Sequence, residues 1–364
     1  MLALGALGLA TAGCSTPEAP PAAVLPLIEA VPGSRLATMA ARDQTLAAAS
    51  LGPGGESPMR LQRRTRRWAA GSTIKVAFRG GDERLHRQMA EVAALWTLHG
   101  NIGFDFGDAG GRPFRTWSPN DTTYTAQIRI GFDEPGYFSC VGDESVNAAC
   151  AAPGQASVNY DRLDQALPAN WRGIVLHQFG HALGLEHEQE GADAACDAEL
   201  RWDDEPGYVR TTDAAGRLAR DHAGRWPGIY TVLAGPPHRW SRARVDVTLR
   251  HPPVSRAFER GVADPASVMR SDFGEWMYRA GRGSRCFAAR QERLSALDER
   301  GMAALYPRVP SDVAESLRRY EAALASMRDA DRLAPPLLRF VQGRLAVLEA
   351  THGARRPMYL PAAR

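Results

Sequence analysis

The chain has 364 residues, of which 44% are hydrophobic and 23% charged, as is ordinary for a soluble globular protein. No stretch reaches the roughly 18–20 apolar residues that a membrane-spanning helix needs, which argues against an integral membrane protein. The net charge is only +3, and Lys75 is the one lysine among 44 basic residues. The arginine excess therefore looks like a compositional bias, and we predict no nucleic-acid partner.

The N-terminus carries a short apolar run from Leu2 to Ala12 that leads to Cys14. Its length is typical of a signal peptide, and small residues before a cysteine resemble a bacterial lipoprotein signal. No Lys or Arg precedes the run, and Thr11 stands where leucine is usual in such signals. We expect residues 1–14 to be a signal with lipidation at Cys14, which anchors an exported protein to the membrane of the cell envelope. Plain secretion and an apolar start without function stay open.

Residues 15–67 are rich in Ala, Pro and Gly, a composition that predicts a mostly disordered tether. A basic cluster closes this segment, at Arg60, Arg63, Arg64, Arg66 and Arg67. We interpret the cluster as a solvated lead-in to the first strand. Attraction to anionic lipid headgroups and a processing site for a trypsin-like protease are the alternatives.

Periodicity after residue 67 alternates between strand and helix patterns. Strands are predicted over 73–78, 102–106, 127–132, 137–141 and 156–160, and helices over 83–99 and 173–184, the latter with Asn170 as N-cap. The chain then looks loop-rich to Pro265, and further helices are predicted over 290–305, 311–330 and 335–350. These elements predict an α+β fold with a mixed sheet and helices packed on it.

One motif carries the chemistry, His177-Gln-Phe-Gly-His181 followed by Gly184 and His187. Two histidines four residues apart project from one face of a helix, so both imidazoles can bind the same ion. Gly184 can take the left-handed conformation that ends a helix and returns His187 to that ion. Three neutral imidazoles with one open position suit a catalytic zinc ion, Zn²⁺.

This spacing, followed by a methionine turn at Asp264-Pro-Ala-Ser-Val-Met269, is the metzincin signature. The chain further resembles the bacterial astacin-like zinc metallopeptidases. The resemblance covers residues 68–307 and rests on Ile74-Lys-Val-Ala-Phe78, Trp96, Asn101-Ile-Gly-Phe104, His187-Glu-Gln189, Trp202-Asp203, Leu294-Ser-Ala-Leu-Asp298 and Leu305-Tyr-Pro307.

The resemblance implies a domain over residues 68–310 with a metzincin-type mixed twisted sheet and two long helices. A zinc cleft would separate the sheet from a smaller loop-rich C-terminal subdomain, and residues 311–364 would form a helical extension. His177, His181 and His187 would bind the zinc ion, and Met269 would pack beneath it. An extended peptide or protein would pair with an edge strand at Tyr137, Phe138 and Ser139.

Two positions depart from the family pattern. Gln178 stands where the family has the glutamate that acts as general base, and an amide cannot accept a proton at neutral pH. Ser271 stands where the family has a tyrosine, for which Tyr278 could substitute. The carboxylates of Glu186, Glu188 and Glu190 flank the third histidine, and we interpret them as a solvated turn rather than a replacement base.

Four cysteines remain after Cys14, and in an exported protein they allow three disulfide pairings. We favour Cys140–Cys150, which would clip the loop after the edge strand, and Cys196–Cys286, which would tie the lower subdomain. Ligation of a metal by these thiols is disfavoured because no Cys-x-x-Cys pair exists.

The sequence therefore predicts an exported zinc metallopeptidase-like protein that hydrolyses peptide bonds by zinc-activated water. Gln178 weakens or abolishes this activity. The alternative is a catalytically inactive lipoprotein that binds peptides or proteins and retains the zinc site. A third interpretation is a structural lipoprotein whose C-terminal helices contact a partner.

Overall fold

In the computed structural model, the described part of the chain comprises residues 29, 31–49, 66–108, 112–187, 196–214, 216, 218–236, 238–250, 264–271, 273–289 and 291–307. Its centre is a five-stranded sheet in the order β2-β1-β3-β5-β4. The strands are β1 (Thr73–Phe78), β2 (Gly103–Asp105), β3 (Ile128–Gly131), β4 (Tyr137–Ser139) and β5 (Val158–Tyr160).

The sheet is mixed, as the sequence predicts. Strands β2, β1, β3 and β5 pair in parallel, and β4 runs antiparallel to β5 and forms one edge. Each predicted strand is present, most of them shorter at their ends than predicted. Among the described residues, β4 therefore has a partner strand on one side only, that of β5.

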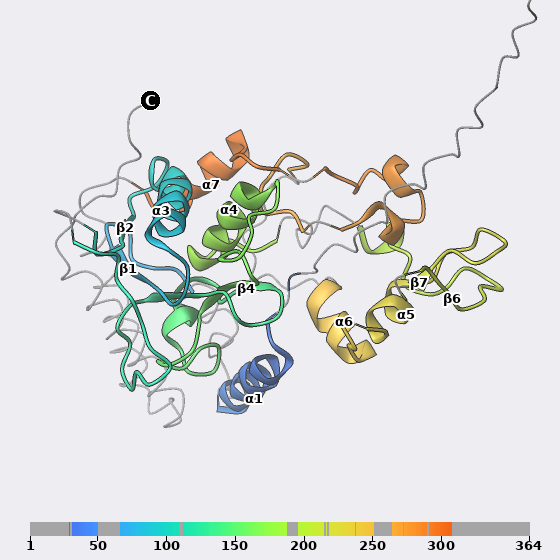
Figure 1. The fold of residues 1–364 in the computed structure, drawn as a ribbon, viewed down its shortest axis with the longest axis horizontal. Coiled ribbons are helices and arrows are strands. Elements are labelled where there is room, and N and C mark those ends of the chain that lie inside the picture. Colours follow the sequence, from blue (N-terminus) through green and yellow to red (C-terminus); the bar gives the residue numbers. More distant parts are fainter. Residues whose placement is uncertain are drawn as a thin grey trace, which may run out of the picture.

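Two helices pack on the sheet, α3 (Glu83–Thr97) and α4 (Trp171–Ala182). The two helices are neighbours on the same face of the sheet (Figure 1). Helix α3 starts where Asp82 accepts a hydrogen bond from the backbone N–H of Leu85 at 2.7 Å. Asn170 precedes α4, as predicted, but its side chain makes no capping hydrogen bond.

The main hydrophobic core lies between the sheet and these two helices. Its largest fully buried side chains include those of Trp96, Phe78, Phe104, Phe106 and Phe179. They come from β1, α3, α4 and the segment around β2, so the apolar faces predicted from periodicity meet in one cluster. This core holds α4, the helix that carries the first two histidines.

A second hydrophobic cluster is formed by described residues that lie between Cys196 and Phe287 in the chain. It is less irregular than predicted, because this region contains α5 (Ile229–Ala234), α6 (Arg242–Leu249) and a two-stranded hairpin of β6 (Thr211–Thr212) and β7 (Leu218–Ala219). Outside these short elements, the described part of this region is irregular, in keeping with the prediction of a loop-rich stretch to Pro265. These elements are too short for a periodic pattern to distinguish them from loops.

The last described helix, α7 (Ala296–Leu305), begins six residues later than predicted. Ser295 and Asp298 form a capping box, with the Ser295 Oγ accepting from the N–H of Asp298 at 2.9 Å. This cap sets the start of the helix. The helices predicted over 311–330 and 335–350 lie outside the described residues.

Both favoured disulfides, Cys140–Cys150 and Cys196–Cys286, are present in the structure. The first closes a ten-residue separation after β4, and the second joins residues 90 positions apart in the second hydrophobic cluster. Over the described residues, no helix combines the length and apolar character needed to cross a membrane.

Arg129 is a fully buried cation on β3. Its guanidinium donates to the backbone carbonyls of Ala126, Ser145 and Gln155 at 2.8–3.0 Å, and it lies 4.8 Å from the ring centroid of Tyr124. Burial lowers its pKa to about 10, which leaves it charged at neutral pH. Arg129 therefore joins β3 to the loops beside β4.

We expect Arg129→Met to lower the free energy of unfolding by about 3 kcal/mol, because several buried carbonyls would lose a charged donor. Urea denaturation measures this change. The matched control is Arg84→Met on the exposed face of α3, for which the change should stay within about 0.5 kcal/mol. Equal effects of the two variants would contradict the role of Arg129.

Candidate functional site

Helix α4 presents His177 and His181 one turn apart, and both side chains are buried. The middle and the end of the helix are held by hydrogen bonds from two aromatic side chains. Trp96 Nε1 donates to the carbonyl of Leu176 at 2.9 Å, and Trp68 Nε1 donates to that of Ala182 at 2.8 Å. These bonds fix the turns from which the two imidazoles project.

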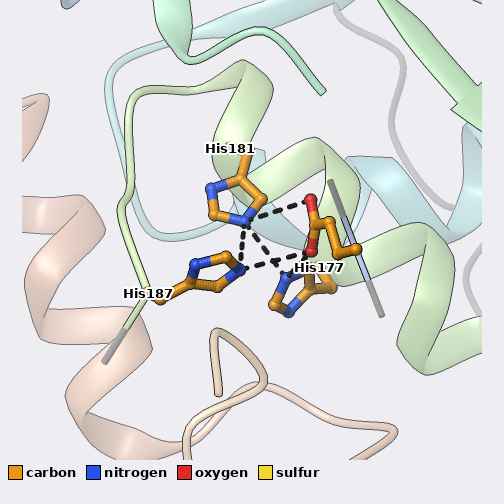
Figure 2. A group of neighbouring side chains, drawn as sticks. His177, His181 and His187 are labelled. Atoms are coloured by element: carbon orange, nitrogen blue, oxygen red, sulfur yellow. Dashed lines mark hydrogen bonds and ion pairs between the residues drawn. The ribbon is translucent and has the colours of Figure 1, made fainter. Parts of the chain in front are cut away.

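His187 returns to the helix through the turn that the sequence predicts. Gly184 has a φ of +97°, in the left-handed region that favours glycine. The Nε2 atom of His181 lies 3.1 Å from the Nε2 atoms of both His177 and His187. The three imidazoles thus point toward one another (Figure 2).

The other ring nitrogens of two histidines contact backbone carbonyls. His177 Nδ1 lies 2.7 Å from the carbonyl oxygen of Val268, and His181 Nδ1 lies 2.7 Å from that of Leu185. An Nδ1–H that donates to a carbonyl leaves the lone pair on Nε2. Burial lowers the pKa of His177, which favours the neutral imidazole that a metal ligand requires.

The methionine turn packs against α4. Met269 is buried, and a Cβ added at Gly180 would lie 2.2 Å from its sulfur atom. Gly180 therefore allows the turn to approach the helix closely. The same turn supplies the Val268 carbonyl that contacts His177.

Glu29 is a site residue that the sequence did not reveal. Its Oε2 atom lies 2.6 Å from Nε2 of His177 and 3.3 Å from Nε2 of His187, and Oε1 lies 3.4 Å from Nε2 of His181. The four residues can each offer one ligand atom, and these atoms lie within 4.8 Å of one another. The only signal in the sequence was a carboxylate isolated in an apolar segment, between Ile28 and Ala30.

Glu29 is followed by a helix where the sequence predicted a tether. Helix α1 (Gly33–Ala49) lies beside β4 and α6 (Figure 1). Arg35 bonds to Glu134 near β4, and Arg244 of α6 donates to the Val31 carbonyl at 3.5 Å. The prediction of disorder is wrong for residues 33–49. Their alanines favour a helix once tertiary contacts anchor it, and composition alone does not show such contacts.

Gln178 is 2% exposed, and its Oε1 atom is buried with no hydrogen-bond partner among the described residues. A buried amide oxygen without a partner is costly, so the site is incomplete without a polar occupant beside it. This observation points to a polar group or water that would donate a hydrogen bond to Gln178.

The other predicted residues are placed as follows. Tyr278 packs in the second hydrophobic cluster between Phe273 and Phe287, with ring centroids 6.5 and 5.8 Å away, so its burial there has a structural explanation. Glu186 lies 3.4 Å from Arg66 in an ion pair. The edge-strand residues Tyr137, Phe138 and Ser139 form β4, whereas Cys14, Glu188 and Glu190 lie outside the described residues.

The donor set fits a zinc ion. Two ligand atoms at 2.0–2.1 Å from a tetrahedral zinc ion are about 3.4 Å apart, close to the 3.1 Å between the imidazole nitrogens. Three Nε2 lone pairs that face one another repel unless a cation lies between them, and nitrogen ligands suit zinc. Glu29 offers a fourth ligand, which would close the site.

Comparison with solved structures finds similarity to myroilysin and to a fish enzyme. One myroilysin structure is 24% identical, covers 68% of this chain and 98% of its own, and has a TM-score of 0.47. Another myroilysin structure is 22% identical, covers 67% of this chain and 86% of its own, and has a TM-score of 0.41. The fish enzyme is high choriolytic enzyme 1, a hatching enzyme zinc-protease from the medaka Oryzias latipes. It is 15% identical, covers 66% of this chain and 94% of its own, and has a TM-score of 0.38. No protein family and no curated protein matches the sequence.

Proposed function

We propose that this chain is an exported zinc metallopeptidase-like protein in which His177, His181 and His187 hold one zinc ion. The observation that carries the proposal is the convergence of three buried or half-buried imidazoles on one point together with the Glu29 carboxylate. Helix spacing explains two of the histidines, and the Gly184 turn explains the third. The site therefore follows from local structure that the sequence specifies.

Hydrolysis of peptide bonds is weak in this proposal because of Gln178. A zinc ion bound at the histidines would supply Lewis acidity and lower the pKa of a water toward about 7. Gln178 can orient a water by a hydrogen bond, but its amide cannot take the proton that a general base must remove. The residue retains the shape of the family's glutamate and lacks its proton chemistry.

The N-terminal segment closes the site in this proposal. Glu29 lies against all three histidines, so a polypeptide that reached them would first have to displace this carboxylate. The combination of Glu29 and Gln178 favours the second candidate function, a catalytically inactive protein that binds extended peptides or proteins along β4. Both candidates share the zinc site and differ in turnover.

Export is supported by the two disulfides, which persist in oxidising compartments. Lipid attachment at Cys14 would hold the domain at a membrane surface. Pairing of an extended peptide with β4 is supported by the edge position of that strand.

Metal analysis of the purified full-length chain tests the proposal. We expect about one zinc ion per chain, and His181→Ala to reduce this content to less than roughly a tenth, because a buried ligand is lost. The matched control is His99→Ala, since His99 lies outside the site and pairs with Glu299 at 3.6 Å. Absence of zinc from the unmodified chain, or unchanged zinc in His181→Ala, would overturn the site.

A further inference from the structure

A second binding feature lies beside β4, where Arg35 of α1 is 8% exposed. Its Nη2 donates to Glu134 Oε1 at 2.6 Å, and its Nη1 donates to the carbonyl of Ala156 at 2.6 Å. The guanidinium carbon also lies 4.9 Å from the ring centroid of Phe138, on the edge strand. A carboxylate, a carbonyl and an aromatic face thus surround one cation. We call the set of Glu134, Phe138 and Ala156 the guanidinium pocket.

We propose that the guanidinium pocket binds the arginine side chain of a polypeptide that lies along β4, and that Arg35 occupies it in cis. The proposal rests on the peptide-binding function proposed above and adds a residue preference to it. Arginine suits this pocket better than lysine, because its planar fork can donate to two acceptors at once while its face stacks on a ring.

The pocket is built independently of the side chain that fills it. Asn159 is fully buried on β5, and its Nδ2 donates to the carbonyls of Glu134 and Gly136 at 2.6 and 2.7 Å. Asp161 accepts from the N–H of Gly136 at 3.0 Å. These bonds hold the turn that carries Glu134 to the neighbouring strand, so the turn should keep its shape when α1 leaves. Such preorganisation lowers the cost of binding a second polypeptide.

The electrostatics of the pocket favour a cation. Burial raises the pKa of the Glu134 carboxyl, and Arg35 acts in the opposite direction. An uncovered Glu134 would lose its hydrogen-bonded cation and would keep only the weaker attraction of Arg79. A cationic side chain from another polypeptide would restore that partner.

The location of the pocket connects it to the metal site. Glu29 lies at the histidines, and Arg35 enters the pocket six positions later in the same segment. The positions of Glu29 and Arg35 therefore show that one polypeptide segment can reach the histidines and the pocket together. A chain that displaced this segment would meet both features.

Chemical complementation of the full-length Arg35→Ala variant tests the pocket. Methylguanidinium at millimolar concentration should raise the melting temperature of this variant saturably. Methylammonium, which has the charge without the fork, and methylurea, which has the planar shape without the charge, should not. The double variant Arg35→Ala/Glu134→Gln should lose the response. An equal response to all three compounds, no response to any, or a response that survives Glu134→Gln would overturn the proposal.

Peptide binding tests the occupant in a way that does not depend on the stability of one variant. A peptide with the sequence of residues 29–42 should bind the full-length Glu29→Ala/Arg35→Ala chain at least roughly tenfold more tightly than the same peptide with citrulline at position 35. Equal affinities would overturn the arginine preference. Neither measurement requires zinc. Absence of metal would therefore contradict the proposed function, whereas the guanidinium pocket would still be decided by these two measurements.

Discussion

Replacing Gln178 by glutamate is expected to raise the rate of peptide-bond hydrolysis by about 10²–10⁴-fold. The carboxylate would occupy the position of the buried amide that follows His177 in α4 and could accept a proton there. Cleavage of a denatured protein by the full-length chain, followed by mass spectrometry of the products, measures the gain. Because Glu29 contacts the same histidines, the comparison is also made with Glu29→Ala present in both chains.

Three controls separate this effect from contamination and from damage to the site. A zinc chelator should abolish cleavage by Gln178→Glu, and adding His181→Ala to that variant should do the same. Gln178→Asn, which keeps an amide at the position, should remain as slow as the unmodified chain. Chelator-sensitive cleavage by the unmodified chain at the rate of the glutamate variant would show that Gln178 does not limit the reaction. The inactive-binder candidate would then be wrong.

Loss of the Cys196–Cys286 disulfide is expected to lower the free energy of unfolding by about 4.6 kcal/mol. The bond closes a loop whose ends are 90 positions apart, and it lies in the second hydrophobic cluster. The cross-link restricts the unfolded chain, so its removal increases the entropy of that state. The double variant Cys196→Ser/Cys286→Ser, compared with the oxidised chain in urea, measures the change.

The other disulfide provides an internal comparison. Cys140 and Cys150 are ten positions apart, so replacing both by serine should cost about 2.7 kcal/mol by the same loop-entropy relation. Removing Cys196–Cys286 should therefore lower the free energy of unfolding by roughly 2 kcal/mol more than removing Cys140–Cys150. If the short-loop variant is the less stable of the two, packing around Cys140 outweighs loop entropy, and the expected order is wrong.

Much of the fold could be predicted because the relevant signals are local. The strands from β1 to β5 and the helices α3 and α4 follow from side-chain periodicity over adjacent residues. The short helices α5 and α6 could not be recognised in this way, since one or two turns do not establish a period. Their stability comes from the aromatic side chains of the second cluster, such as those of Trp202 and Trp240.

Two buried arginines outside the histidine motif were not predictable. Arg129 and Arg35 belong to a chain in which 44 residues are basic, so neither is distinctive in the sequence. Arg129 became notable only when the fold surrounded it with backbone carbonyls, and Arg35 only when α1 placed it against Phe138. Burial and partners, rather than residue type, give these cations their roles.

The sequence by itself determined the three histidines and the amide at Gln178. His177 and His181 are four residues apart, and His187 follows Gly184 by three residues. These local features bring the three imidazoles together through helix geometry and a tight turn. Only the tertiary structure showed that Glu29, 158 positions before His187, lies at the same point. Its position depends on long-range contacts of α1 with the region of β4 and with α6. Such contacts join residues that are far apart in the sequence, so local patterns cannot predict them.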